Sequence, residues 1–192
     1  MTDLGERRGL NTTYYEPAED SYLLATACVE RIRPDDTVLD VGTGSGFVAA
    51  AIHDETGADV TGIDCNPHAC QRTAARDIPV IRGNIVDPCC HDSFDVVVCN
   101  PPYLPTAPEE VRDDWLGVAL SGGETGRDFV NRLFDDVGRV LRPDGRLLLL
   151  VSSLMDVARV RERAKQAGLH GTEIDRDESF PFEVLLVLEF EH

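Results

Sequence analysis

The sequence contains almost no lysine, because every basic residue except Lys165 is an arginine. Its 192 residues carry 18 basic and 35 acidic side chains, which gives a formal net charge of −17. An acidic chain of this kind favours adaptation to high salt, where bulk ions screen self-repulsion, over an acidity that serves to repel nucleic acid. The charge is therefore a weak argument against a nucleic-acid substrate, which can still dock on a local basic patch.

Long apolar runs are missing as well. No stretch reaches the roughly 18 apolar residues that a membrane-spanning helix needs, and the segment from Met1 to Arg8 lacks the apolar centre of a signal peptide. We therefore expect a cytoplasmic protein. A hydrophobic content of 42% in 192 residues suits one folded domain over residues 1–192, and we find no repeat or linker that divides it.

No pair of cysteines has the C-x-x-C spacing of a redox or zinc motif. The Cys89-Cys90-His91 stretch has no second ligand pair at zinc-like spacing, so we expect no metal site. In a cytoplasmic protein a disulfide framework is also not expected. The sequence predicts six free thiols: Cys28, Cys65, Cys70, Cys89, Cys90 and Cys99.

Helix-like and strand-like segments alternate along most of the chain, which predicts a mostly parallel sheet covered by helices on both faces. The expected helices cover 19–32, 47–53, 67–76, 128–141 and 155–167, and the expected strands cover 37–41, 59–64, 79–82, 94–99 and 146–151. Two further strands, 169–175 and 183–190, follow without a helix between them. A seven-stranded Rossmann-like α/β sheet with an antiparallel C-terminal strand pair is the layout of class I methyltransferases that use S-adenosylmethionine.

A glycine-rich loop follows the first expected strand with the pattern D-x-G-x-G-x-G, formed by Asp40, Gly42, Gly44 and Gly46. Loops at the carboxyl ends of parallel strands are the expected ligand sites of an open sheet. A dinucleotide fingerprint requires glycine at the sixth position counted from Gly42, and this position is Phe47. The loop is instead similar to the cofactor loop of S-adenosylmethionine enzymes.

The charges around this loop favour the same cofactor. Asp40 at the loop entrance suits a cationic sulfonium and ammonium better than a pyrophosphate, and Asp64 ends the second strand, where a carboxylate can accept both ribose hydroxyls. By similarity to methyltransferases, Asn84 and Ile85 after the third strand are expected at the adenine. The alternative is a glycine-rich turn with two incidental aspartates and a turn asparagine.

Asn100-Pro101-Pro102-Tyr103 follows the fourth expected strand, beside the first strand and hence beside the cofactor methyl group. Transfer to a planar NH₂ group requires its delocalised lone pair to face the methyl carbon. The Asn100 side-chain oxygen and the Pro101 carbonyl can hold the two N–H bonds in that orientation. The two prolines stiffen the loop, and Tyr103 offers a flat face to the acceptor. A proline-rich cap after a strand is the rival interpretation.

Together with Tyr15 to Ser21 (YEPAEDS), these motifs resemble the HemK-type protein-glutamine N5-methyltransferases, over nearly the whole chain. The closest match is the short archaeal and eukaryotic form, which modifies the Gly-Gly-Gln glutamine of the class-1 translation release factor. The resemblance implies that Ser21 and its neighbours close over the cofactor, and that the loop from Gly122 to Gly126 shapes the acceptor pocket. Relatives often carry aspartate where this chain has Asn84, which puts the adenine contact in doubt.

The resemblance also implies a partner, since the short enzymes of the family work as heterodimers with a small zinc-binding activator protein. The third strand is expected at the edge of the sheet, where Ile78, Val80 and Ile81 would offer an apolar edge to a partner strand. We therefore expect the isolated chain to be poorly soluble or weakly active.

Three other functions remain open on the sequence. A nucleic-acid methyltransferase acting on adenine N6 or guanine N2 could use the same Asn-Pro-Pro-Tyr geometry, although the only local basic candidates are Arg7, Arg8, Arg31 and Arg33. A non-catalytic subunit that binds cofactor and scaffolds a partner would have no need of paired N–H acceptors. An NAD(P) oxidoreductase is disfavoured by Phe47.

Overall fold

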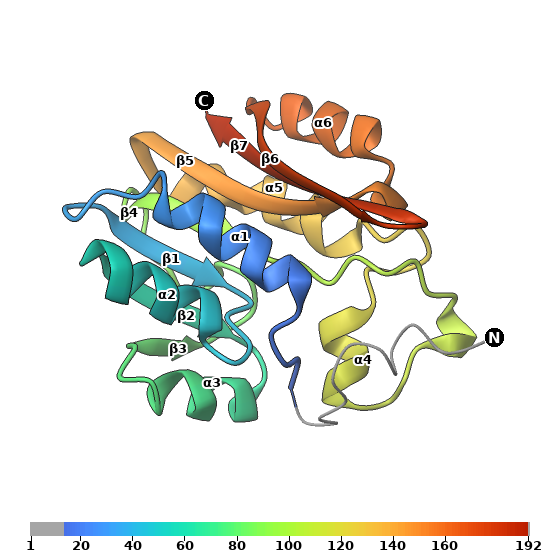
Figure 1. Cartoon of the computed structure of the whole chain (residues 1–192), viewed down its shortest axis with the longest axis horizontal. Helices are drawn as coiled ribbons and strands as arrows, with labels where there is room; N and C mark the ends of the chain where they lie inside the picture. The colour runs from blue at the N-terminus through green and yellow to red at the C-terminus, as the bar shows by residue number, and fades with distance from the viewer. Residues whose placement is uncertain (1–13, 192) are drawn as a thin grey trace.

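The computed structural model describes residues 14–191, so the N-terminal segment from Met1 to Arg8 considered above lies outside the described residues. Seven strands form one sheet in the order β3-β2-β1-β4-β5-β7-β6 (Figure 1). The strands are β1 (Thr37–Val41), β2 (Asp59–Asp64), β3 (Val80–Arg82), β4 (Phe94–Cys99), β5 (Leu141–Ser152), β6 (His170–Phe180) and β7 (Glu183–Glu191). Only β7 runs antiparallel to its neighbours β5 and β6. The class I methyltransferase topology expected from the sequence is confirmed.

Helices cover both faces of this sheet. They are α1 (Glu19–Val29), α2 (Phe47–Thr56), α3 (Pro67–Ala74), α4 (Trp115–Leu120), α5 (Asp128–Val140) and α6 (Val157–Gln166), with short 3₁₀ turns η1 (Pro108–Glu110) and η2 (Ser153–Met155). Helices α1 and α2 pack against each other on one face, and α5 packs with α6 on the other (Figure 1). None of the helices among residues 14–191 is long and apolar enough to cross a membrane.

The central strands are buried because they carry apolar side chains on both faces. Val96, Val97 and Val98 of β4 are each fully buried between the two helical layers, which is the pattern of a parallel strand covered on both sides. Helix α5 buries Val130, Leu133, Phe134, Val137 and Val140, whose spacing places them on one helical face. The polar side chains that could bind a ligand therefore lie at the carboxyl ends of the strands and in the loops that follow them.

Some boundaries differ from those expected. Strand β5 starts at Leu141 instead of residue 146 and passes through Pro143, because an irregularity in the register after Phe94 absorbs the residues around the proline. Strand β6 continues to Phe180 instead of residue 175. Helix α4 lies inside the segment that we expected to be a plain loop. Six apolar-rich residues are too few to show a helical period.

Strand β3 lies at the edge of the sheet, as expected, and pairs only with β2. The expectation for Ile78 was wrong, because this side chain is buried in the core at 3% exposure and cannot contact a partner. Val80 and Ile81 are half-buried, and Ile81 packs partly against the core. The apolar edge that a partner strand could cover is therefore narrower than the sequence suggested.

Candidate active site

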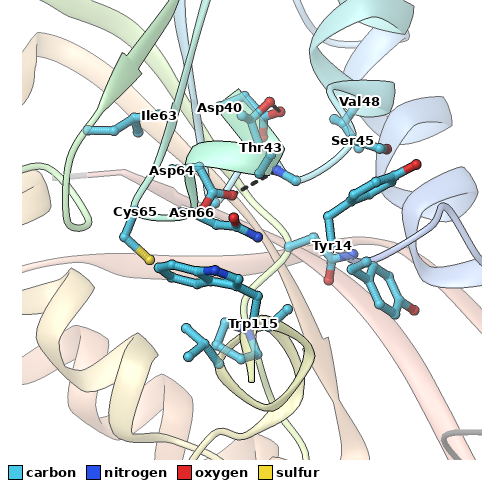
Figure 2. A pocket seen from close by; sticks show the side chains of 18 of the residues that line it. Tyr14, Asp40, Thr43, Ser45, Val48, Ile63, Asp64, Cys65, Asn66 and Trp115 are labelled. Carbon is cyan, nitrogen blue, oxygen red and sulfur yellow. Dashed lines mark hydrogen bonds between the residues drawn. The ribbon is translucent and has the colours of Figure 1, made fainter. Parts of the chain in front are cut away.

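A cavity of about 220 Å³ opens at the carboxyl ends of β1, β2 and β4, between the glycine loop and α4 (Figure 2). It brings together residues from segments as far apart in the sequence as Tyr14 and Arg132. The predicted site residues that line it are Ser21, Asp40, Gly42, Gly44, Asp64, Asn84, Ile85, Asn100 and Pro102. Gly46, Pro101 and Tyr103 were also predicted for the site, and they lie outside this lining.

The glycine loop is held against the end of β2 by Asp64. One oxygen of Asp64 accepts a hydrogen bond from the Gly44 backbone N–H at 3.0 Å (Figure 2), and the other accepts one from the Asn66 N–H at 2.8 Å. Gly42 and Gly44 have φ values of +72° and +55°, in the left-handed region that favours glycine. A carboxylate has about four acceptor positions, so Asp64 can hold the loop and still accept hydrogen bonds from a diol in the cavity.

Asp40 is a buried carboxylate at the entrance of the loop, with 3% exposure. The Thr43 hydroxyl donates a hydrogen bond to its Oδ2 at 2.7 Å. Burial, together with a smaller effect of the nearby charge of Asp64, raises the pKa of Asp40 from 3.8 to about 6, although the hydrogen bond from Thr43 acts to lower it. Burial likewise raises the pKa of Asp64. Two carboxylates with raised pKa values in one cavity favour a cationic ligand, because a cation would stabilise the ionised form of both.

The loop after β3 supplies the far end of the cavity. Ile85 has a φ of +51° and is buried at 7% exposure, so its side chain forms part of the apolar lining. The Asn84 side-chain amide donates a hydrogen bond to Asp87 Oδ2 at 3.1 Å. A polar and an apolar side chain therefore lie next to each other here, which is the arrangement expected for contacts with a heteroaromatic base.

Asn100 lies where β4 ends and carries an unusual atom. Its side-chain Oδ1 is buried and, within residues 14–191, has no hydrogen-bond partner. Its Nδ2 donates a long hydrogen bond of 3.5 Å to the Ser21 hydroxyl. A buried acceptor without a partner costs about 1–3 kcal/mol, and such atoms in folded proteins call for a functional explanation. An Oδ1 without a partner can accept a hydrogen bond from an N–H group of a ligand.

A second recess of about 20 Å³ lies directly beside the first cavity. The two cavities share Tyr15, Asn100, Pro102 and Ala119 in their linings. Pro101 and Tyr103, which are absent from the larger cavity, line this recess. Tyr103 is buried at 4% exposure, and its hydroxyl donates a hydrogen bond to Asp20 at 3.2 Å. The Asn-Pro-Pro-Tyr stretch thus lies between a large cavity and a small one.

The loop from Gly122 to Gly126 supports this wall of the recess. Gly122 N–H donates to the Leu104 carbonyl at 3.0 Å, and the Thr106 N–H donates to the Gly123 carbonyl at 2.9 Å. Gly126 has a φ of +71°, and a side chain there would collide with the Tyr103 carbonyl. The loop therefore buttresses the segment that follows Asn100, in keeping with its predicted part in shaping the acceptor pocket.

The wall of the cavity that faces the glycine loop was not predicted from the sequence. Trp115, Val118 and Ala119 of α4 and Phe129 and Arg132 of α5 all line it. Figure 2 shows the indole of Trp115 close to Cys65 and Asn66. The one usable signal was Asp114, whose side chain caps α4 by accepting the Gly117 N–H at 2.8 Å. A single capping residue in a long loop is too weak to predict a helix that faces a ligand.

Gly46 allows close packing at the start of α2. It begins α2 with a φ of +74°, and a Cβ built on it would lie 2.9 Å from both Cα and Oγ1 of Thr73, which is fully buried in α3. The third glycine of the loop therefore allows the start of α2 to approach α3. The predicted direct contact with the cofactor is not seen in the cavity lining.

We expect Gly46→Ala to destabilise the chain by about 3 kcal/mol or more, since strain in the left-handed backbone and a collision with Thr73 add together. Gly57→Ala is the matched control, because Gly57 ends the same helix with a φ of +77° and has no neighbour within 4 Å of a built Cβ. That variant should lose only the backbone term of about 1–2 kcal/mol. Urea unfolding of both variants measures the difference, and equal losses would contradict the packing role.

No group of three or more His, Cys, Asp or Glu residues with the geometry of a metal site occurs within residues 14–191. The six cysteines are free thiols, as expected. The polar side chains that line the cavity include the carboxylates of Asp40 and Asp64 and the carboxamide of Asn100.

Comparison with known proteins agrees with this geometry. A family model described as a methyltransferase domain matches residues 38–123. A Methanocaldococcus jannaschii protein, provisionally named protein N5-glutamine methyltransferase MJ0928, is 31% identical over 190 residues that cover 96% of this chain and 94% of the relative. Human methyltransferase HEMK2 is 33% identical over 179 residues, covering 86% of this chain and 84% of its own.

Among solved structures, the E. cuniculi Mtq2–Trm112 complex, described as responsible for methylation of the termination factor eRF1, superposes with a TM-score of 0.77. The sequence identity is 28%, and the match covers 93% of this chain and 98% of the other. The motifs, the sheet order and these relatives agree over nearly the full length. The chain belongs to the HemK-type family of protein N5-glutamine methyltransferases.

Proposed function

We propose that this protein transfers a methyl group from S-adenosylmethionine to the side-chain nitrogen of a protein glutamine, the Gly-Gly-Gln glutamine of the class-1 translation release factor. The observation that carries the proposal is Asn100, which lines both the large cavity and the small recess and whose buried Oδ1 has no hydrogen-bond partner within residues 14–191. A cofactor in the large cavity and a carboxamide in the recess would meet at this atom.

The donor set of the large cavity fits this cofactor. S-adenosylmethionine, when bound, supplies a methyl group on a positively charged sulfur. Asp40 and Asp64 place two carboxylates under electrostatic strain in the cavity, and Asp64 retains acceptor capacity for a ribose diol. Asn84 and Ile85 offer a polar and an apolar contact for an adenine ring. Ser21 closes the cavity from the α1 side.

The recess would orient the acceptor. Asn100 Oδ1 can accept one N–H of the glutamine amide, and the Pro101 carbonyl can accept the other, since both residues line the recess. Two acceptors fix the rotation of the amide and aim its nitrogen at the methyl carbon, which favours the transfer through positioning and electrostatics. The Tyr103 ring forms a wall of the same recess, where it can pack against the planar amide.

The direct test is mass spectrometry of the release factor after incubation with S-adenosylmethionine and the chain co-purified with its co-expressed activator protein. A mass increase of one methyl group on the Gly-Gly-Gln glutamine is expected, in high as well as low salt because of the acidic composition. A parallel reaction with DNA and RNA tests the rival amino-methyltransferase function. Transfer to nucleic acid alone would remove the proposal, and no transfer to either acceptor would favour a cofactor-binding scaffold.

We further propose that the active species is a heterodimer with a small zinc-binding activator protein, which adds a strand to the open edge of β3. The support is that β3 is an edge strand of three residues and that Val80 is half-buried and outside the core cluster. The relative in E. cuniculi was solved as a complex with Trm112. An unpaired edge of this kind satisfies its backbone groups when a partner strand is added.

For this interface, Val80→Lys is expected to abolish co-purification of the chain with the co-expressed activator, because a charged side chain would face the apolar surface of the partner strand. Phe182→Lys is the control, since Phe182 is 92% exposed and lies in the turn between β6 and β7, at the opposite edge of the sheet. Pull-down of tagged chain measures both. Loss of the partner with Phe182→Lys and not with Val80→Lys would place the interface at the other edge.

A further inference from the structure

Asp20 is a buried carboxylate to which the proposed chemistry assigns no part. It is the second residue of α1 and is 3% exposed. A negative charge in the first turn of a helix is stabilised by the helix dipole, but burial of a charge at this depth also requires hydrogen bonds. Asp20 lines the small recess next to Asn100, so its hydrogen bonds bear on the acceptor side of the site.

The carboxylate of Asp20 accepts four hydrogen bonds. Its Oδ2 accepts from the hydroxyls of Tyr15 at 2.9 Å and Tyr103 at 3.2 Å. Its Oδ1 accepts from the Ser21 backbone N–H at 2.6 Å and from the Ser21 hydroxyl at 3.2 Å. Four bonds correspond to the full capacity of about four acceptor positions on a carboxylate. Asp20 thus connects the N-terminal segment, α1 and the loop after β4, across 83 residues of sequence.

The hydrogen bonds to Asp20 determine the orientation of the Ser21 hydroxyl and, through it, of the Asn100 side chain. The Ser21 hydroxyl donates its single proton to Oδ1 of Asp20. The Ser21 oxygen then offers only lone pairs to Asn100. The group of Asn100 that turns toward Ser21 must therefore be the NH₂, which is the observed contact of 3.5 Å. The carboxamide is planar, so its Oδ1 is directed away from Ser21, and it is the atom without a partner.

We propose that Asp20 is a positioning residue, which holds the Asn100 carboxamide through Ser21 with its oxygen free for the acceptor. The same carboxylate holds the Tyr103 ring against the recess through its hydroxyl. This inference rests on the proposed function, because it assigns Asp20 to the acceptor side of that site. Without an obligate acceptor at Asp20, the Ser21 hydroxyl could rotate and donate to Asn100, and the Asn100 amide could then turn its NH₂ into the recess.

The test is Asp20→Asn, which keeps the size of the side chain but lets it donate as well as accept. We expect kcat to fall by about a hundredfold, as for loss of a well-oriented polar group in an active site, while the dissociation constant of S-adenosylmethionine stays within about threefold. The pH profile of kcat should keep its shape at a lower level. A proton acceptor at this position would instead lose one limb of the profile, and that result would overturn the positioning role.

Glu19→Gln is the matched control, because Glu19 is the exposed neighbour in the same helical turn and carries the same charge. It should leave kcat unchanged. A double-mutant cycle with Asn100→Ala adds a readout that general destabilisation cannot imitate: in the Asn100→Ala background, Asp20→Asn should lower kcat by less than about threefold. Additive losses in the cycle would contradict the proposal. If Asp20→Asn does not fold, the same cycle with Ser21→Ala decides the question.

A second measurement needs no methyl acceptor and therefore separates this inference from the proposed function. The side-chain NH₂ signals of Asn100 in a ¹H–¹⁵N spectrum are identified by their absence in Asn100→Ala. They should shift in Asp20→Asn and keep their position in Glu19→Gln. Unchanged signals in Asp20→Asn would overturn the link between Asp20 and Asn100, whereas the expected shifts together with an inactive complex of the wild-type chain and its activator would overturn only the proposed acceptor.

Discussion

Replacing Asn100 with alanine is expected to lower kcat by about a thousandfold or more, with the dissociation constant of S-adenosylmethionine within about threefold of wild type. The expected loss is large because Asn100 lines both cavities and its Oδ1 has no other hydrogen-bond partner within residues 14–191. Its hydrogen bond forms with the acceptor amide, so its removal affects transfer more than cofactor binding. Transfer of labelled methyl groups to a glutamine peptide measures kcat.

Cofactor binding can be followed in the same variant without turnover. Trp115 is the single tryptophan of the chain and lines the large cavity, so its fluorescence reports on occupancy. Asn131→Ala is the matched control, since Asn131 is a half-buried asparagine on α5 that does not line either cavity. Full activity of Asn100→Ala with normal binding would show that the amide oxygen plays no part in catalysis.

The same variant should lose little stability. Asn100 Oδ1 has no hydrogen bond to lose within residues 14–191, and an unsatisfied buried acceptor costs about 1–3 kcal/mol in the folded chain. Alanine removes this cost and leaves a small space, so the two effects oppose each other. A melting temperature close to that of the wild type, combined with a large loss of turnover, is the signature of a residue retained for function.

Those parts of the site that follow buried strands could be predicted from the sequence. β1, β2 and β4 were recognised with their observed bounds because short apolar runs end at glycine, aspartate or asparagine. In a parallel sheet, residues just after these strands meet at one edge. Asp40, Asp64 and Asn100 therefore could be assigned to one cavity without coordinates.

Contacts between distant segments could not be predicted in this way. The hydrogen bond between Tyr103 and Asp20 joins residues 83 positions apart, and no periodic pattern records it. The sequence also gives no measure of depth, so Ile78 was taken for an exposed edge residue although it is buried. Helix α4 is too short to show a period, and Trp115 was missed with it. Of these residues, Trp115 lines the large cavity and Asp20 and Tyr103 line the small recess, so the parts of the site that the sequence did not reveal come from segments outside the strand ends.

Asp40→Asn is expected to weaken binding of S-adenosylmethionine by about a hundredfold at pH 8, since it removes a buried charge that faces the cationic ligand. The wild-type chain should show a pH dependence that the variant lacks. Burial raises the pKa of Asp40 to about 6, and a bound cation would lower this pKa again. Binding then releases a proton, and the affinity of the wild type should fall about tenfold per pH unit below pH 6. Fluorescence titration with S-adenosylmethionine from about pH 5 to about pH 8 measures the affinity of the wild type and of the variant at each pH.

Asp40→Asn is expected to increase the stability of the free chain, although it weakens cofactor binding. The pKa of Asp40 is 3.8 in the unfolded reference and about 6 when folded, so the folded state binds its proton more tightly. The protonated carboxyl of Asp40 therefore stabilises the fold fully below the unfolded pKa of 3.8, and this stabilisation is lost as the pH rises through the folded pKa of about 6. The free energy of unfolding lost in this way is roughly 3 kcal/mol at pH 8. Asparagine avoids this cost but weakens the bond from Thr43, so a net gain of about 1–2 kcal/mol is expected.

Asp59→Asn provides the control for both measurements, because Asp59 is an exposed aspartate at the start of β2, at the other end of the strand from Asp64. This substitution changes the net charge equally and should alter neither binding nor the pH dependence of urea unfolding. A stability gain and an affinity loss at one buried carboxylate follow from the same cause: the charge is unfavourable in the empty fold and favourable only beside a cation. Asp40→Asn that binds S-adenosylmethionine normally at pH 8 would place the positive ligand elsewhere.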